Sequence, residues 1–107
     1  MKSISVADLA LWRQQQHPFL LLDVRREQAV TASGVQIEGA LWKNPVLWLD
    51  WKDGIPNQTP VVVYCAHGQE ISQGLTATLS AMGVEAAHLD GGISAWQDHG
   101  QPVVPVA

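Results

Sequence analysis

The single cysteine of the chain lies in a segment whose residues suit nucleophilic chemistry. Cys65 directly follows the apolar run Val61–Tyr64 and precedes Gly68, a residue that lets the backbone turn. From Gln69 onward the apolar residues have helical spacing. Backbone N–H groups at such a strand–loop–helix junction stabilise an anion, and they lower a cysteine pKa from about 8.5 to roughly 3.5–7.5. The pattern predicts a reactive thiolate at Cys65, although the residues alone equally allow a small buried apolar side chain.

The segments that must position this loop alternate between strands and helices. Strands are predicted where apolar residues run unbroken, at residues 19–24, 61–64 and 86–89, with a short extended piece within 35–41. Helices are predicted at residues 5–16, 26–33, 69–82 and 93–99. This order predicts an α/β fold, a mostly parallel sheet with helices on both faces. Ligands of such sheets collect at the carboxyl ends of strands, where Cys65 lies.

Four of the five tryptophans are expected to belong to the core. Trp96 lies on a predicted helix, whereas Trp42, Trp48 and Trp51 occupy a stretch whose secondary structure the pattern does not define. Aromatic side chains of a small domain usually pack inward, so this is the expectation for all four. The alternative for the cluster is the mouth of a pocket or a partner surface.

Length, charge and cysteine content exclude several classes of protein. The 107 residues suit one domain, 1–107, and a net charge of -4 offers no cationic surface for nucleic acid or an anionic membrane. The longest apolar run, residues 61–66, is far shorter than the roughly 20 residues that span a bilayer. The first residues lack a signal-peptide pattern, so the cytoplasm is the expected compartment. One cysteine excludes an internal disulfide and a thiolate zinc site, and the four scattered histidines predict no metal.

Four ordered blocks of sequence together resemble the single-domain rhodanese family. They are LLDVR at 21–25, IEGA at 37–40, VVVYCAHG at 61–68 and LDGGISAW at 89–96. The resemblance implies a rhodanese-like three-layer fold with a central sheet of about five strands. It also implies that the cysteine carries sulfur as a persulfide.

In such a sulfurtransferase Cys65 would attack the outer sulfur of a small anionic donor, thiosulfate or a persulfide or polysulfide. An acceptor thiol, a protein sulfur acceptor or cyanide would then remove the sulfur, and no cofactor is required. The residues that would hold the charged sulfur with their backbone amides form the loop after the cysteine: Ala66, His67, Gly68, Gln69, Glu70 and Ile71.

Two positions of the loop depart from related families. Similar phosphatases and arsenate reductases use Cys-x5-Arg, and the position of that arginine holds Ile71 here, which favours sulfur transfer over phosphoryl transfer. Rhodanese loops frequently carry a cation where this chain has Glu70, which would repel a dianion such as thiosulfate. Glu70 is interpreted as a favourable charge at a helix N-terminus, with its side chain turned from the pocket. His67 would assist at mildly acidic pH or have no role.

The remaining residue pairs of the resemblance are interpreted as supports. Asp23 and Arg25 are expected to tie loops together as an ion pair rather than to contact substrate. Gly91 and Gly92 are expected to supply turn geometry beneath the loop. The sequence leaves two functions open besides that of a sulfurtransferase. One is a non-catalytic rhodanese-like interaction or redox and stress-sensing module, and the other is an oxyanion reductase that would need an outside thiol.

Overall fold

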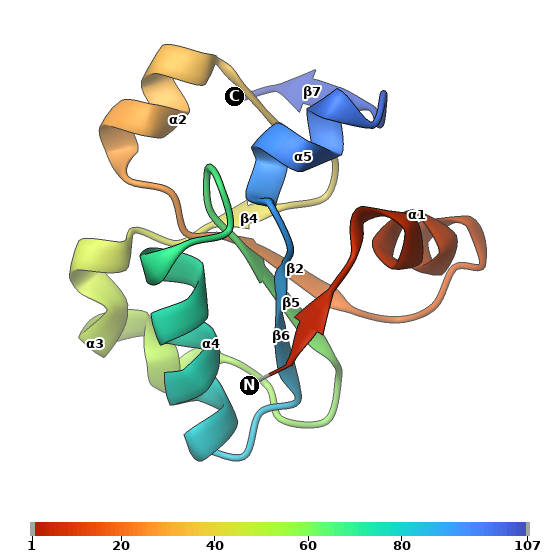
Figure 1. The fold of residues 1–107 in the computed structure, drawn as a ribbon. Helices are drawn as coiled ribbons and strands as arrows, with labels where there is room; N and C mark the ends of the chain where they lie inside the picture. Colours follow the sequence, from red (N-terminus) through yellow and green to blue (C-terminus); the bar gives the residue numbers. More distant parts are fainter. Residues whose placement is uncertain (1, 107) are drawn as a thin grey trace.

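A parallel sheet of five strands runs through the molecule, which a computed structural model describes for residues 2–106 (Figure 1). The strand order is β1-β6-β5-β2-β4, and every neighbouring pair is parallel. Its members are β1 (Ser3–Ile4), β2 (Leu20–Asp23), β4 (Leu41–Trp42), β5 (Val61–Tyr64) and β6 (Ala86–Leu89). The predicted α/β class, with a central sheet of about five mostly parallel strands, is confirmed.

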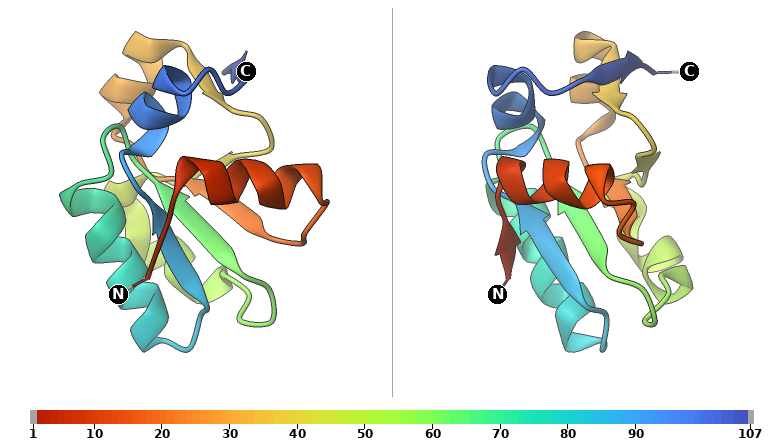
Figure 2. Two further views of the ribbon diagram at one scale, coloured as in Figure 1. Left: turned by 45° about the vertical axis from the view of Figure 1, so that its right-hand side comes forward. Right: turned by 90° about the vertical axis from the view of Figure 1, so that its right-hand side faces the viewer.

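Helices cover both faces of this sheet. The α-helices are α1 (Val6–Gln14), α2 (Glu27–Ser33), α3 (Trp48–Trp51), α4 (Glu70–Ala81) and α5 (Gly92–Asp98). Two short 3-10 helices, η1 (Pro45–Leu47) and η2 (Lys52–Gly54), flank α3. Figure 2 shows α1 and α5 on one side of the sheet and α3 and α4 on the other, the three-layer arrangement that the sequence predicts.

The strand β5 explains why an unbroken apolar run forms the centre of the fold. Val62 and Tyr64 pack in the core beneath α1 and α5, whereas Val61 and Val63 pack in the core beneath α4. All four side chains are buried because successive residues of a strand point to opposite faces. Two separate cores, one on each face, therefore hold the strand that ends at Cys65.

The helix boundaries follow from their capping residues. The Ser5 hydroxyl accepts a hydrogen bond of 3.1 Å from the backbone N–H of Asp8 and begins α1, as the sequence predicts. Gly34 adopts a left-handed φ of 69° and ends α2. The helix α4 starts at Glu70 and ends at Ala81, each one residue inside the predicted range.

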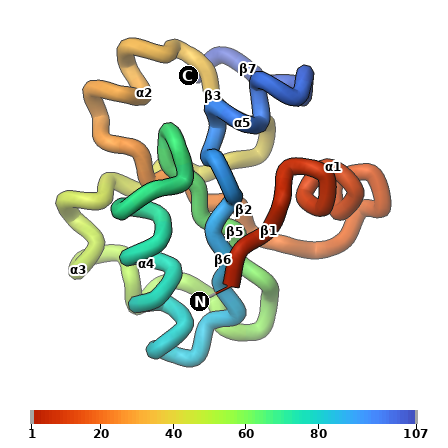
Figure 3. The backbone as a smooth tube through the Cα atoms, viewed as in Figure 1, coloured from red at the N-terminus to blue at the C-terminus, as the bar shows by residue number. Residues whose placement is uncertain are grey.

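The segment 35–41 is more elaborate than the single extended piece expected. It forms two strands that join different sheets, because the chain turns at Gly39, whose φ is 86°. The first, β3 (Val35–Ile37), pairs antiparallel with β7 (Val103–Pro105), while the second, β4, pairs with β2 at the edge of the main sheet (Figure 3). The strands β1 and β7 were not expected from the sequence, since two or three residues are too few to show a periodicity.

The expectation that the tryptophan cluster packs in the core is correct for Trp51, which packs against the core on the α4 face, and wrong for Trp42 and Trp48, which join neither core. Trp42 is 38% exposed, and Trp48 and Trp51 are half-buried. The indole N–H of Trp42 donates to the carbonyl of Arg25 at 2.9 Å, and that of Trp51 to the carbonyl of Asn44 at 2.8 Å. Trp42 lies on the edge strand β4 and Trp48 begins α3, and neither packs in the core of either face of the sheet. Trp96, in contrast, is fully buried as predicted.

Candidate active site

Cys65 lies at the carboxyl end of β5, in the loop that leads to α4. Its side chain is only 6% exposed, and it lines a cavity of about 280 Å³. The other residues around this cavity come from the loop and from the chain after β2: Arg25, Arg26, Ala29, Ala66, His67, Gln69, Glu70 and Ile71. The structure thus brings most of the predicted loop residues together around one thiol. Gly68 belongs to the same loop but does not line the cavity.

The Cys65 thiol donates a hydrogen bond to the hydroxyl of Ser72, with 3.2 Å between Sγ and Oγ. Burial raises the pKa of this thiol, but the Ser72 hydroxyl and the backbone N–H groups of Ser72, Gln69 and His67 outweigh burial. The pKa of Cys65 therefore lies below its ordinary value. This is the direction that the strand–loop–helix pattern predicts, and a lowered pKa favours the thiolate form of the cysteine.

Ser72 is the functional residue that sequence reasoning missed. It is fully buried in the first turn of α4, and its hydroxyl also donates to the carbonyl of Gln69 at 3.4 Å. A signal was present, because a serine in the first turn of the helix after a nucleophile faces back toward the loop. The loop predicted from the sequence ended at Ile71 and therefore did not include Ser72, the next residue.

The carbonyl groups of the loop point away from the cavity and are held by the helices behind it. The N–H of Ile93 donates to the Cys65 carbonyl and that of Ser94 to the Ala66 carbonyl, both at 3.0 Å. The side chain of Gln73 donates to the Gly68 carbonyl at 2.8 Å. No carbonyl or side-chain oxygen of residues 2–106 accepts from the N–H groups of residues 66–69. These N–H groups are available to an anion at the thiol.

Two glycines make this close packing possible. Gly92 has a φ of 61°, and a Cβ at this position would lie 2.3 Å from the Cys65 carbonyl oxygen. Gly68 has a φ of 69°, and a Cβ there would lie 2.6 Å from the backbone nitrogen of Gly91. Any side chain would push the loop and the β6–α5 turn apart. The geometry agrees with the interpretation of Gly91 and Gly92 as supports of the loop.

Asp23 and Arg25 form a buried ion pair beside the cavity. The Nη2 of Arg25 lies 2.7 Å from Oδ2 of Asp23, and the Nε lies 3.0 Å from Oδ1. The guanidinium also donates to the hydroxyl of Ser33 and to the carbonyl of Val35. Burial alone lowers the pKa of Arg25, but the hydrogen bonds and the charge of Asp23 outweigh it and raise the pKa. The Arg25 guanidinium is committed to the protein, as expected of a tie between loops.

Tyr64 extends this buried network from β5. Its hydroxyl donates to Oδ2 of Asp23 at 3.0 Å and accepts from the backbone N–H of Ile37 at 3.2 Å. Burial raises the pKa of Tyr64 well above its ordinary value, and the charge of Asp23 adds to the effect. The tyrosine therefore stays neutral. Its two hydrogen bonds fix the end of β5, directly before Cys65, to β2 and β3.

The charges that face the cavity are few. Arg26 is exposed and forms no ion pair with any residue that the structure describes, so its guanidinium is free to meet an anion. Glu70 is exposed at the first position of α4 and is one of the residues that line the cavity. His67 is exposed in the loop. Ile71 lines the cavity where a phosphate-binding site would hold its arginine.

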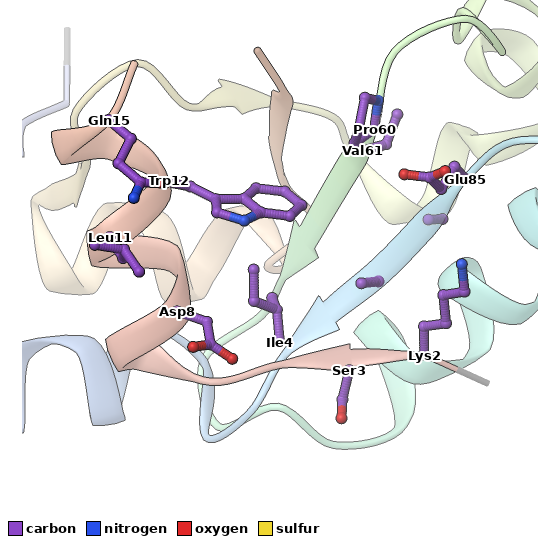
Figure 4. A pocket seen from close by; sticks show the side chains of 12 residues that line it. Lys2, Ser3, Ile4, Asp8, Leu11, Trp12, Gln15, Pro60, Val61 and Glu85 are labelled. Carbon is purple, nitrogen blue, oxygen red and sulfur yellow. The ribbon is translucent and has the colours of Figure 1, made fainter. Parts of the chain in front are cut away.

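A second cavity, of about 410 Å³, lies away from the thiol (Figure 4). It is formed between α1 and the amino ends of β5 and β6, with Trp12 and Asp8 extending from α1 and Glu85 preceding β6. It is the larger of the two, but the one cysteine of the chain is not among the residues that line it. The smaller cavity at Cys65 is the candidate active site.

Two further features of the described residues bear on the class of site. No three His, Cys, Asp or Glu side chains of residues 2–106 group in a way that would hold a metal ion. Over the same residues, every helix is too short or too polar to cross a bilayer.

Comparison with known proteins places this arrangement among described folds. The family model for the rhodanese-like domain matches residues 5–99. A rhodanese-related protein from Thermoplasma volcanium superposes with a TM-score of 0.84 at 26% identity, over 97% of this chain and 98% of that one. A rhodanese-like domain protein from Staphylococcus aureus superposes with a TM-score of 0.85 at 24% identity, over the full length of both chains.

A third similar structure has a different description. It is a protein of unknown function from Rhodopseudomonas palustris, described as a possible tyrosine phosphatase, with a TM-score of 0.80 and 26% identity over 97% of this chain and 85% of that one. A search of curated proteins found no match.

Proposed function

The chain belongs to the rhodanese-like domain family, and on that premise we propose that it is a sulfurtransferase that carries sulfur as a persulfide on Cys65. One observation supports this function most directly. The Cys65 thiol has a lowered pKa and lines an open cavity beside backbone N–H groups of its loop that have no oxygen acceptor among residues 2–106. A thiolate in that position is a ready nucleophile, and its surroundings suit the negative charge of a persulfide.

The first half of the proposed reaction loads the cysteine. The Cys65 thiolate attacks the outer, sulfane sulfur of thiosulfate or of a persulfide or polysulfide. A new S–S bond forms to Cys65 while the donor's S–S bond breaks, and the leaving group takes the bonding electron pair: sulfite from thiosulfate, a thiolate from a persulfide, or the shortened chain from a polysulfide. No net oxidation or outside electron source is needed, because the sulfane sulfur is transferred in its own oxidation state.

The second half unloads the cysteine. A thiol, a protein sulfur acceptor or cyanide attacks the outer sulfur of the Cys65 persulfide, and the bond to Cys65 breaks to regenerate the thiolate. The acceptor must come from outside, since the chain has no second cysteine. No cofactor enters either half. The cytoplasm, which keeps thiols reduced, is the compartment in which we propose that the cycle runs.

The loop geometry supports this function over its competitors. A non-catalytic module would have an ordinary thiol pKa, whereas hydrogen bonds lower the pKa of Cys65. A tyrosine phosphatase would need an arginine to clamp its tetrahedral anion, and Ile71 occupies that position. An oxyanion reductase would require an outside thiol to resolve its intermediate and has no feature of the cavity in its favour.

Mass spectrometry of the intact protein tests the proposal. We expect wild type to gain the mass of one sulfur atom after incubation with thiosulfate, polysulfide or glutathione persulfide, and to lose it again when a thiol is added. The Cys65→Ser variant is the matched control, because it removes the nucleophile and keeps a side chain of similar size. If no donor adds a sulfur atom that is missing from Cys65→Ser, the function is wrong.

A further inference from the structure

The cavity of about 410 Å³ that lies away from Cys65 has a volume typical of small-molecule sites. It opens at the amino ends of β5 and β6, whereas Cys65 follows the carboxyl end of β5. In Figure 2, no helix of the described chain lies over these amino ends on the α1 side of the sheet. The sulfur chemistry proposed above makes no use of this cavity.

One face of α1, continued by Gln15 just after the helix, forms a wall of the cavity. The lining residues Asp8, Leu11, Trp12 and Gln15 follow one another at intervals of three, one and three residues, which places them on one side of the helix (Figure 4). Leu11 is 46% exposed, whereas Leu9, on a different face, is buried in the core. This wall therefore carries an aromatic ring, an apolar side chain and a carboxylate that the core does not use.

The floor of the cavity is apolar and belongs to the core on the α1 face of the sheet. Ile4 of β1 is buried in that core, and Ala87 of β6 packs against the same core together with Trp12. Because Ala87 carries only a methyl group, it fills little of the space beside the indole ring. The cavity thus offers an apolar surface on two sides, the floor and the tryptophan.

Trp12 is held in place from outside the cavity. The ring of His17 stacks on the indole, with 4.2 Å between the ring centroids and 13° between the planes. The chain returns to Trp12 through Gln16, whose φ of 56° lies in the left-handed region that residues other than glycine rarely adopt. The N–H of His17 then donates to the Trp12 carbonyl at 2.9 Å. A ring that is fixed in this way loses little freedom when a ligand binds.

The charges around the cavity favour a cation beside Trp12. The charged lining residues are Asp8, Glu85 and Lys2, two acids and one base. Figure 4 shows Lys2 and Glu85 across the cavity from α1, where their opposite charges offset each other, and Asp8 on the same wall as Trp12. Asp8 forms no ion pair with another described residue. An ammonium group beside this carboxylate and the indole gains charge attraction and a cation–π contact together.

We propose that this cavity binds a small organic cation, an ammonium group on a flat apolar body, with the charge beside Asp8 and Trp12 and the body against Ile4 and Ala87. A neutral molecule of the same shape lacks the charge attraction, and an anion is repelled by Asp8 and Glu85. The site is separate from Cys65 and does not depend on the proposed sulfurtransferase function.

Three probes of similar size and different charge test the class of ligand. They are 2-phenylethylamine, a cation at pH 7, the neutral 2-phenylethanol and the anion 3-phenylpropanoate. The NMR signal of the Trp12 indole N–H reports binding at this cavity, and it is assigned as the signal that Trp12→Phe lacks. We expect the Kd of the amine to be at least about fivefold lower than that of the alcohol, and the propanoate to bind most weakly.

Asp8→Asn removes the charge and keeps the shape of the side chain. We expect it to raise the Kd of the amine at least about threefold and to leave the Kd of the alcohol within about twofold of wild type. Asp50→Asn is the matched control, because Asp50 is also an exposed acid in the first turn of a helix, α3, but does not line the cavity. Thermal unfolding checks that both variants are folded. Cys65→Ser should bind the amine as wild type does.

Each outcome decides for or against the cation site. The inference is wrong if the amine shifts no Trp12 signal at millimolar concentrations, or if the alcohol or the propanoate binds as tightly as the amine. It is also wrong if Asp8→Asn weakens the amine no more than Asp50→Asn does. A preference for the amine that Asp8→Asn reduces and both Asp50→Asn and Cys65→Ser retain supports the proposal.

Discussion

The Ser72 hydroxyl and the Cys65 thiol lie 3.2 Å apart in a buried contact that joins the first turn of α4 to the end of β5. A hydroxyl at that position stabilises thiolate, because it can donate to the sulfur once the thiol proton has left. The contact makes Ser72 part of the reactive centre rather than a structural residue of the helix.

We therefore predict that Ser72→Ala raises the pKa of Cys65 toward its ordinary value. A hydrogen bond of this kind contributes about 1 kcal/mol, so alkylation by iodoacetamide at pH 6 should slow about fivefold. The measurement is the alkylation rate against pH. Wild type should show its midpoint below about 8.5, the ordinary cysteine value, and Ser72→Ala should shift that midpoint upward. Ser80→Ala, at an exposed position of the same helix, should match wild type.

Glu70 is predicted to limit the use of thiosulfate. Replacing it in Glu70→Arg exchanges a repelling charge for an attracting one beside the cavity, so the KM for thiosulfate should fall about threefold to tenfold at low salt. The gain should shrink as salt is added, because exposed charges are screened. Glu85→Arg makes the same change in charge at the distant cavity and should leave the KM unaltered. Equal effects of the two variants would contradict a local role for Glu70.

The buried pair Asp23–Arg25 is predicted to be essential for stability. Arg25→Met leaves the Asp23 carboxylate buried beside Tyr64 without its cation, which costs about 3–5 kcal/mol of unfolding free energy. Denaturation by urea, followed by circular dichroism, measures the loss. Arg26→Met alters the exposed neighbour that forms no ion pair with a described residue, and it should stay within about 0.5 kcal/mol of wild type. A small loss in Arg25→Met would show that the pair is dispensable.

Gly92 is predicted to tolerate no side chain. In Gly92→Ala the new Cβ would meet the Cys65 carbonyl oxygen at 2.3 Å, in a backbone conformation that already disfavours alanine. We expect the free energy of unfolding to fall by about 3 kcal/mol or more, and the displaced Cys65 thiol to be alkylated more slowly. Gly34 has a similar positive φ, but a Cβ there would meet open space. Gly34→Ala should therefore lower the free energy of unfolding by only about 1 kcal/mol. The difference between the two variants measures the steric contact alone.

The sequence predicts the parts of this fold that depend on local pattern. The apolar run 61–64 defines a strand buried on both faces, and Ser5 and Gly34 mark helix ends by their own chemistry. The strands β1 and β7 escaped prediction because they are short and gain their stability from distant partners. Trp42 and Trp48 were misjudged because burial depends on whether another layer lies beyond them, which no local pattern reveals.

The same division applies to the site. Cys65 and its loop could be predicted, because one strand, one glycine and one helix start within a few residues of each other. The commitment of Arg25 to Asp23 was expected from their spacing. The role of Ser72 depends on the phase of α4 relative to its neighbours. That phase is set by packing across the whole fold rather than by the loop.

The placement of Cys65 between two cores makes it a natural reporter of unfolding. Its side chain packs in the core on the α4 face, while its carbonyl is held by α5, which belongs to the opposite core. Loosening of either core would therefore reach the same sulfur atom. Because the chain has no other cysteine, its accessibility to a thiol reagent in denaturant would follow both halves of the molecule through a single unlabelled probe.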